Sequence, residues 1–413
     1  MGSINLKHTG SGSAIALSSD GTSLLLNGTA IGGGGGGADL YAANESSPTA
    51  QPSATGTNAI AIGDSAVSTG TDSFALGKTR ATGPRSFAVN TGTNTSYGAI
   101  GADSIAMGEF AKASNSMCVA IGRSASSTSY QGLSLGFVAT TTGNQATAIQ
   151  RGLASGEHAF AAHITNSTTS YGASGANSIA MGWQTKATGA NAIAIGRSST
   201  SSDSNSIALG HGANAGASAS ISILGSSLQS AYSFGYGAES LGYAGHDRSM
   251  MLGRGARSRV KGGVHFGGYN GLGAGRNQSG IYIVSLQSTD ATPTALTTTN
   301  TTASTDNQVI LPEDAAYAFQ GTIVVRQNQS GTNAGTDSAA WKVEGLIRRE
   351  STASTTVLVS STVTAISNTP SWGLALSADT TNGGLKIEAT GQASRNLRWV
   401  GTIYTTEVLH QYA

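Results

Sequence analysis

The stretch NSIAMGWQTKATGANAIAIGRSSTSSDSNSIALG, residues 177–210, contains nearly the same six-residue phrase three times. The phrase begins at Asn177, Asn191 and Asn205, so its copies are 14 residues apart. In each copy two large apolar residues stand two positions apart, which places both on one face of a β-strand. The residue between them is Ala and faces the other way. The stretch therefore predicts short strands that recur at a fixed step.

The same step recurs over much of the chain. Ile60 and Phe74 are 14 residues apart, and four such positions in a row begin at Ile105 and again at Ile179. We expect these apolar pairs to form the core of a roll or of a trimer. The candidate residues are Ile60, Ile62, Phe74, Leu76, Ile105, Met107, Val119, Ile121, Leu133, Leu135, Ile179, Met181, Ile193, Ile195, Ile207 and Leu209.

Between successive phrases lies a weaker segment, such as TKATG at 185–189. Fourteen residues suffice for two short strands and two tight turns, in which Gly and Asn supply positive φ angles. The fold class predicted is all-β, with a parallel β-roll or solenoid of about 14-residue coils stacked at about 4.8 Å. So thin a coil cannot enclose its own apolar face, and three copies around an axis would cover it. We therefore expect a homotrimer.

The composition excludes several classes of protein. Of 413 residues only 10% are charged, against about 25% in a typical soluble domain. The net charge of +1 offers no field for nucleic acid or an anionic membrane, and one cysteine excludes an internal disulfide framework. No apolar run reaches the ~18 residues of a membrane helix, and no secretory segment is visible at the N-terminus. We expect synthesis in a cytoplasm and no membrane insertion.

Two irregular coils, each with a polar insertion before the letters SYGA, place Tyr97 and Tyr171 at equivalent positions. Each Tyr either pins its loop to the roll or contacts a ligand. The segment 248–261 concentrates cations, among them Arg254, Arg257 and Arg259, which pair across protomers or bind an anionic sugar. All five side chains are candidates for receptor or inter-protomer contacts.

The ends of the chain follow other patterns. Residues 280–413 alternate like antiparallel strands and predict a jelly-roll-like β-sandwich with three tryptophans in its core, preceded by a linker at 269–279. Residues 1–31 predict a small strand module, and 32–57 a hinge and linker. The hinge residues are Gly32, Gly33, Gly34, Gly35, Gly36 and Gly37.

Enzymatic and metal chemistry find little support in the sequence. Of the seven histidines only His158 and His163 lie close together, and no Cys or carboxylate completes a zinc set. No Asp/Glu pair recurs in the roll as a glycosidase groove would require. We expect no catalytic residues, no metal and no cofactor.

The phrase [Asn/Asp]-[Ser/Ala]-Ile-Ala-x-Gly at its 14-residue step resembles the head repeats of trimeric autotransporter adhesins, over about residues 58–267. The resemblance implies a left-handed parallel β-roll that trimerises through its apolar face. Those adhesins begin with an export signal and end in a coiled-coil stalk and membrane anchor, which this sequence does not show. The layout of N-terminal module, shaft at 58–268 and C-terminal knob instead resembles bacteriophage fibre proteins.

This second resemblance implies a tail fibre on the exterior of a virion, assembled in the host cytoplasm. Its partners would be two further copies of itself, other virion proteins through the N-terminal segment, and a bacterial surface receptor such as a polysaccharide. The shaft loops and the knob would contact the host. The alternatives are a fibre attached to the capsid or neck, and a depolymerising tailspike.

Overall fold

The computed structural model describes strand residues 4–6, 15–19, 24–26 and 29–31 and, from 50 to 410, all but 165–169, 226, 229–231, 238–240, 243–245, 269–272, 331–333 and 369–371. In this described part the helical content is one short 3₁₀ turn, η1 (Ala353–Thr355). The chain forms two compact units, residues 1–131 and 132–413. The predicted glycine hinge lies outside the described residues, as does most of the linker after it.

The first four strands pair in chain order as an antiparallel sheet: β1 (Ile4–Leu6), β2 (Ile15–Ser19), β3 (Leu24–Leu26) and β4 (Thr29–Ile31). This agrees with the strand-like runs expected in residues 1–31. The attachment role of this module stays a prediction.

The rest of the first unit is a parallel β-solenoid in which short and long strands alternate, each paired with its equivalent in the next coil. Ile60 thus lies opposite Phe74, and Ile105 opposite Val119. The long strands are β6 (Ile60–Ile62), β8 (Phe74–Leu76), β10 (Phe87–Val89), β12 (Ile105–Met107) and β14 (Val119–Ile121). The short strands are β5 (Ser53–Ala54), β7 (Val67–Ser68), β9 (Arg80–Ala81), β11 (Gly98–Ala99), β13 (Lys112–Ala113) and β15 (Ser126–Ser127).

The second unit begins with the same architecture, which continues beyond residue 210, where the sequence pattern weakens. Its long strands are β16 (Leu133–Leu135), β18 (Thr147–Ile149), β20 (Phe160–Ala162), β22 (Ile179–Met181), β24 (Ile193–Ile195), β26 (Ile207–Leu209), β28 (Ile221–Ile223), β30 (Phe234–Tyr236), β32 (Met250–Leu252) and β33 (Val264–Gly267). Its short strands are β17 (Thr140–Thr141), β19 (Leu153–Ala154), β21 (Gly172–Ala173), β23 (Lys186–Ala187), β25 (Thr200–Ser201), β27 (Asn214–Ala215), β29 (Ser227–Leu228) and β31 (Leu241–Gly242). The predicted parallel solenoid is confirmed.

The narrow interior of the coil explains why the phrase contains Ala. Ala180 and Ala194 on long strands and Ala187 on a short strand belong to one fully buried cluster. The second position of the phrase is also buried, and there Ser178 donates a hydrogen bond to the Gly175 carbonyl at 2.7 Å. Cys118 takes the same position in its coil, and its thiol donates to the Asn115 carbonyl. In these regular coils the space between the two strands is filled by small side chains, whereas the last coils also enclose Leu228 and Met251.

The first position of the phrase needs a residue that accepts a left-handed backbone. Asn177, Asn191 and Asn205 have φ angles of 55°, 57° and 56°, a region in which Asn is enriched. Their side chains also form a ladder between coils, since the Asn177 and Asn191 amides each donate to the next Asn at 3.2 Å. Backbone conformation and cross-coil bonding thus both favour Asn.

The last position of the phrase yields a stability prediction. Gly196 has a φ of +119°, and a Cβ on it would lie 2.8 Å from the Gly210 backbone of the next coil. We expect Gly196→Ala to lower the free energy of unfolding by more than about 1 kcal/mol, measured by urea unfolding at fixed protein concentration. Gly212→Ala is the control, because Gly212 has a φ of +67° but open space around it. Equal losses in both variants would contradict a role for the close approach between coils.

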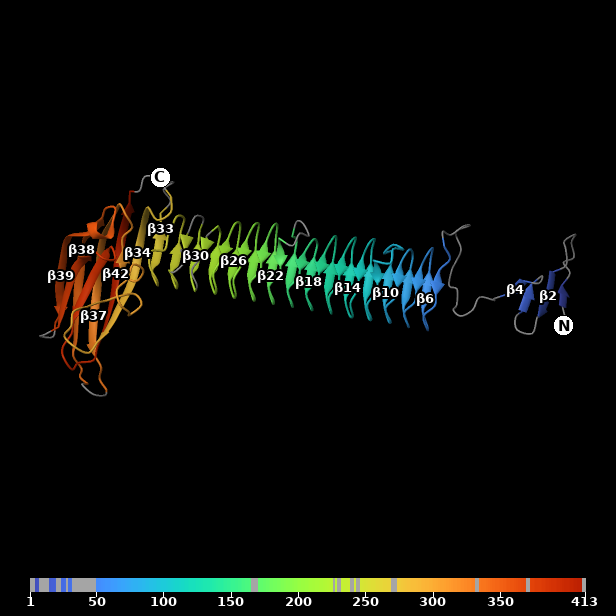
Figure 1. The fold of residues 1–413 in the computed structure, drawn as a ribbon, viewed down its shortest axis with the longest axis horizontal. Helices are drawn as coiled ribbons and strands as arrows, with labels where there is room; N and C mark the ends of the chain where they lie inside the picture. The colour runs from blue at the N-terminus through green and yellow to red at the C-terminus, as the bar shows by residue number, and fades with distance from the viewer. Residues whose placement is uncertain are drawn as a thin grey trace. The chain divides into compact units, whose positions relative to one another are not determined.

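The C-terminal region is a sandwich of two antiparallel sheets. The large sheet has the order β33-β34-β42-β37-β38-β39, and in the small sheet β41 pairs with β40 on one side and with β35 and β36 on the other. The strands are β34 (Asn277–Ser288), β35 (Thr294–Ala295), β36 (Val309–Ile310), β37 (Ala315–Gln327), β38 (Ser338–Arg349), β39 (Val357–Ser367), β40 (Gly373–Asp379), β41 (Gly384–Thr390) and β42 (Leu397–Leu409). Figure 1 shows the long strands of the large sheet side by side.

The topology adds two features that the sequence analysis lacked. Strand β42 returns beside β37, so β42, β37, β38 and β39 have the spatial order of a Greek key. Strand β33 pairs in parallel with β32 and antiparallel with β34, so the end of the solenoid and the large sheet are joined by backbone hydrogen bonds. The first strand of the sandwich begins at Asn277, inside the segment predicted as a linker.

The sandwich core contains the three tryptophans expected there. Trp341, Trp372 and Trp399 are all buried. The rings of Trp341 and Trp399 stack with centroids 5.6 Å apart, and the Trp399 indole donates to the Ser288 hydroxyl at 3.0 Å. This core is rich in large apolar residues, in contrast to the alanine interior of the solenoid.

Candidate binding surfaces

The large apolar residues of the phrase lie on the outside of the single chain. On β24 the central Ala194 has no exposed surface, while Ile195 is 38% exposed. The same alternation holds on every long strand that carries a predicted core residue: the middle residue is buried and its neighbours are half-buried or exposed. The prediction that these residues form the core of the roll is therefore wrong for one chain, because on these strands the inward position belongs to the Ala or Ser between them. Their contact within a trimer stays a prediction.

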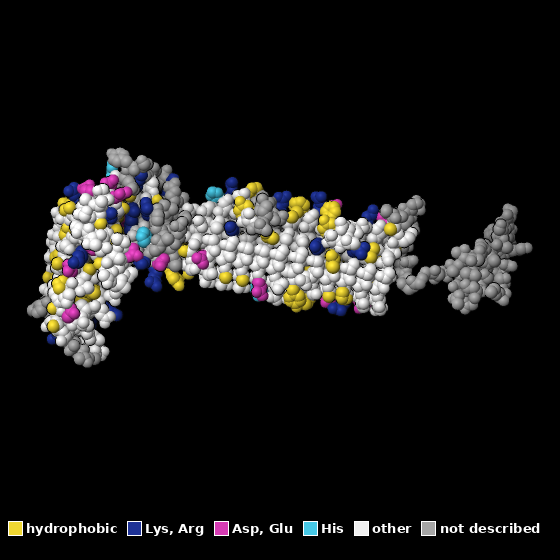
Figure 2. Space-filling view, in the orientation of Figure 1, with side chains coloured by type: hydrophobic (Ala, Val, Ile, Leu, Met, Phe, Trp, Pro, Cys, Tyr) yellow, Lys and Arg dark blue, Asp and Glu magenta, His cyan; other side chains and the backbone are white. Residues whose placement is uncertain are grey.

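The apolar residues at the two outward positions of each long strand form a continuous set, which we call the outer ladder. The outward positions of the short strands are different, being occupied for example by Lys112, Lys186 and Thr200. Figure 2 shows that the roll has few charged side chains on the face in view, with hydrophobic clusters between polar areas. Each coil thus presents a mostly apolar outer side and a more polar one.

The coil corners that follow the long strands carry contacts from one coil to the next. Lys78 pairs with Asp64 at 3.2 Å, and Arg123 with Glu109 at 3.0 Å. In the second unit the Arg151 guanidinium lies 5.0 Å from the centre of the Phe137 ring. Because these pairs are exposed, each contributes little to the free energy of unfolding. Each joins side chains of neighbouring coils in agreement with the strand register.

The two tyrosines of the irregular coils are half-buried against their own roll. Tyr97 packs on Phe110 with ring centroids 5.2 Å apart, and Tyr171 packs against the alanine cluster of the second unit. These contacts favour the interpretation that each Tyr pins its loop.

The three predicted arginine contacts fall in different environments. Arg254 is exposed and Arg257 half-buried, with the Arg257 backbone held by the Gln278 side chain at 3.0 and 3.2 Å. Arg259 is only 8% exposed, and its guanidinium donates to the Gly275 carbonyl at 2.6 Å. The chain folds over Arg259, so this side chain is not at the open surface of one chain; its predicted contact with a receptor or another protomer stays a prediction.

A buried polar cluster lies near Arg259, where the solenoid meets the sandwich. The Glu407 carboxylate accepts hydrogen bonds from Gln278 at 2.8 Å and from Tyr282 and Thr405 at 2.7 Å each. His265, beside Tyr282, accepts a bond from the Arg259 backbone amide. Burial lowers the pKa of His265 to about 4, against the opposing charge of Glu407. Burial and Glu407 also raise the pKa of Tyr282.

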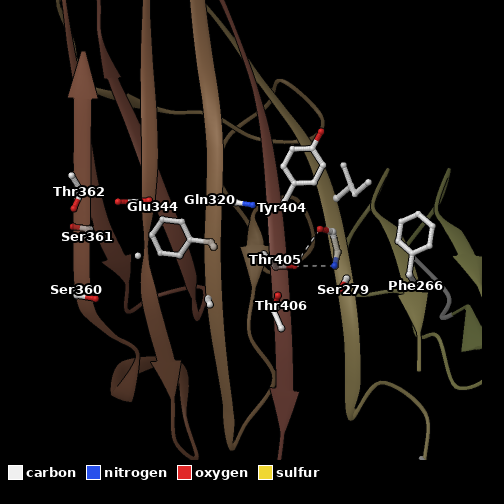
Figure 3. Close-up of a pocket in the computed structure, with 15 residues that line it drawn as sticks. Phe266, Ser279, Gln320, Glu344, Ser360, Ser361, Thr362, Tyr404, Thr405 and Thr406 are labelled. Atoms are coloured by element: carbon white, nitrogen blue, oxygen red, sulfur yellow. Dashed lines mark hydrogen bonds between the residues drawn. The ribbon is translucent and has the colours of Figure 1, made fainter. Parts of the chain in front are cut away.

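A groove of about 670 Å³ crosses the outer face of the large sheet (Figure 3). Strand register explains its shape. One row across the sheet has the small residues Ser279, Thr406 and Ala318, and the next row has the larger Tyr404 and Gln320. The row of small side chains forms the floor of the groove, and the row of larger side chains forms a ledge beside it.

The ledge continues on the neighbouring strands with Glu344 and Thr362, which lie opposite each other. Its aromatic ring, amide, carboxylate and hydroxyl groups offer both stacking and hydrogen bonding, as in sites that bind polar organic ligands such as sugars. Among the lining residues Glu344 supplies the one carboxylate. The groove contains none of the residues singled out by the sequence analysis, because a strand's neighbours cannot be deduced from alternation alone.

Two arginines face each other at another part of the same outer face. Arg326 on β37 lies directly opposite Arg398 on β42, both are exposed, and within the described chain neither has an ion-pair partner. Like charges in directly opposed positions destabilise a sheet.

We therefore expect Arg326→Glu to raise the free energy of unfolding by roughly 0.2–1 kcal/mol at low salt. The gain should shrink as salt screens the new pair. Arg326→Gln, which removes the repulsion without adding attraction, should give an intermediate value in the same urea titration. A loss of stability in both variants would contradict this account of the pair.

The described residues include neither a cluster of metal ligands nor a helix that could span a membrane. No group of three or more His, Cys, Asp and Glu side chains there could hold a metal ion. No helix in that part of the chain is long and apolar enough to cross a membrane.

Comparison with known proteins agrees with the repeat geometry. The pattern of the YadA head domain repeat matches residues 54–79, 99–125, 173–199 and 187–213. No curated protein matches the chain in sequence. A solved structure with some likeness is a tailspike protein, gp49 of Acinetobacter baumannii bacteriophage Fri1, described as a capsular polysaccharide depolymerase. It has 10% identity and a TM-score of 0.23 over 86% of this chain.

The present chain spans 64% of the length of that tailspike. So low a TM-score carries no conclusion about fold or function. The repeat match supports a shaft built like the heads of trimeric autotransporter adhesins.

Proposed function

We propose that this chain is the subunit of a homotrimeric bacteriophage fibre that attaches the virion to a bacterial surface. The observation that carries the proposal is the outer ladder. Its apolar side chains recur on successive coils and stay partly exposed in the single chain. Monomeric soluble proteins rarely leave apolar patches that extend so far, and such patches mark interfaces.

Three copies with their outer ladders turned inward would bury this surface around a common axis. The more polar side of each coil would then face solvent. A closed cyclic trimer uses the same patch on every subunit and leaves no ladder uncovered. The match to the YadA head domain repeat supports this arrangement.

The sandwich supplies the proposed tip, where the groove on the large sheet would bind a surface saccharide. Tyr404 would stack on a sugar ring, while Gln320, Glu344 and Thr362 would bond its hydroxyl groups. The N-terminal strand module would join the fibre to other virion proteins, and the protein would lie on the exterior of the particle.

The test of this function is a glycan-binding assay with the full-length chain. Labelled protein is applied to immobilised bacterial surface polysaccharides, and the supernatant is analysed for released oligosaccharide by mass spectrometry. We expect retention on at least one polysaccharide without release. Tyr404→Ala should reduce retention, and Tyr130→Ala, an exposed tyrosine of the roll, should not. Release of oligosaccharide would indicate a depolymerising spike and contradict a fibre that only attaches. A lack of retention on every polysaccharide would contradict saccharide binding.

A further inference from the structure

A second hollow, of about 380 Å³, lies beside the buried polar cluster within the second unit. Its walls include Arg257 and Arg259 from the end of the solenoid, Arg349 from the end of β38, and His246. Ala353 of η1 and Asn382 close its other side. Three arginines are thus among the residues that line one small pocket, and none of its lining residues is Asp or Glu.

Arg259 is the most enclosed of the three. Its guanidinium donates to the Gly275 carbonyl, and its Nε is buried with no hydrogen-bond partner in the described chain. No described carboxylate lies within 4.0 Å of it. An ionised group taken from water is costly unless it is paired, and a single carbonyl dipole does not neutralise a full charge.

Arg349, which lines the same pocket, repeats this situation. Its Nη1 donates to the Leu311 carbonyl at 2.7 Å, and its Nε is likewise buried without a partner. The guanidinium also packs close to Gly383, where an added Cβ would lie 2.5 Å from Nη1. Two arginines with unused donor groups therefore line the same space.

The acidic residues of the surrounding elements are engaged elsewhere. Asp306 pairs with Lys261 at 2.7 Å, and Glu407 accepts the three bonds of the buried polar cluster. Asp379 accepts bonds from the Asn382 side chain and from the backbone amides of Asn382 and Thr381. In the described chain neither Arg259 nor Arg349 therefore has a carboxylate within ion-pair distance.

The arginines of the pocket also affect the pKa of the neighbouring His246. Burial is the main cause that lowers the pKa of His246, and the charges of Arg259 and Arg257 lower it further. The Ser258 contact and the Asp306 charge act in the opposite direction. The pocket thus favours the neutral form of the His246 imidazole.

We infer that this pocket binds the oxyanion of a small ligand, with Arg259 and Arg349 as the groups that hold it. A guanidinium presents its N–H groups in a planar fork that matches carboxylate and phosphate oxygens. The pocket falls within the usual range of ligand sites, about 300–1,000 Å³. An acidic sugar and inorganic phosphate offer the same chemistry, and the test distinguishes them.

The test is isothermal titration calorimetry of the full chain with sodium glucuronate and, separately, with sodium phosphate, at constant ionic strength. We expect saturable binding of one ligand per chain, and no binding of glucose. Arg349→Gln should weaken binding roughly ten-fold or more, because a hydrogen bond to a charged group is lost. The matched control is Arg348→Gln, on the outer side of the same strand and paired with Glu350.

A third variant keeps the test decisive should the loss of Arg349 disturb folding. Ala353→Glu places a carboxylate beside Arg349, so it should abolish ligand binding while the thermal midpoint holds or rises. Binding of glucuronate alone would assign the site to acidic sugars, and binding of phosphate alone to phosphate groups. If neither glucuronate nor phosphate binds, or if Arg349→Gln binds as tightly as the unaltered chain, the inference is overturned.

Discussion

Replacing Met181 and Ile195 by glutamate should convert the trimer into folded monomers. Each side chain is 38% exposed in the single chain, so a charge there reaches water and the coil stays intact. In the proposed trimer the same positions face the axis, where two carboxylates from each of three chains would be buried without partners. An uncompensated buried charge costs about 3–5 kcal/mol, which is enough to dissociate the assembly.

The measurement is the solution mass by light scattering, with circular dichroism to verify that the β-structure is retained. The matched control is Lys186→Glu with Thr200→Glu, on the outward side of the short strands that follow the same two long strands. This control should remain trimeric. Dissociation of both double variants, or of neither, would contradict an interface on the outer ladder.

Acid should destabilise the chain through His265. In the folded chain the imidazole stays neutral down to about pH 4, whereas the unfolded chain takes up the proton near pH 6.5. The unfolded state therefore binds more protons between these values. The stability that His265 contributes is complete above pH 6.5 and is lost as the pH falls toward 4. The drop from 6.5 to about 4 corresponds to roughly 3 kcal/mol.

Urea unfolding at about pH 7 and about pH 4.5, at fixed protein concentration, measures this loss. His265→Ala should be less dependent on pH than the unaltered chain. Some dependence should remain, because burial lowers the pKa of His246 as well. The control His211→Ala, at an exposed position of the roll, should keep the full dependence. An unchanged pH dependence in His265→Ala would contradict this assignment.

The solenoid could be predicted from the sequence because the local requirements of one coil are all present in the six-residue phrase and its spacing. The step of the phrase gives the coil length, and the left-handed Asn and the close-packed Gly fix its turns. The direction of burial was harder to deduce. Large apolar residues such as Ile193 and Ile195 usually mark a core, but a coil of two short strands has room only for Ala194 between them.

The binding surfaces of the sandwich could not be predicted, because they depend on which strands are neighbours. Strand alternation does place Glu407 on the inward side, in phase with the buried Ile403 and Leu409. His265 offered a clearer signal, since it is paired with the middle positions of the preceding long strands, where most coils have Ala. Charged side chains are normally exposed, so the sequence predicts Arg259 at the surface. Its burial can be recognised only from the fold.

The most direct test of the account is the solution mass of the full-length protein, by light scattering on a size-exclusion column. The account predicts a mass of about three times 41.1 kDa, because the outer ladder needs two further copies to cover it. A monomer of about 41.1 kDa with its ladder exposed to water would contradict the trimeric fibre.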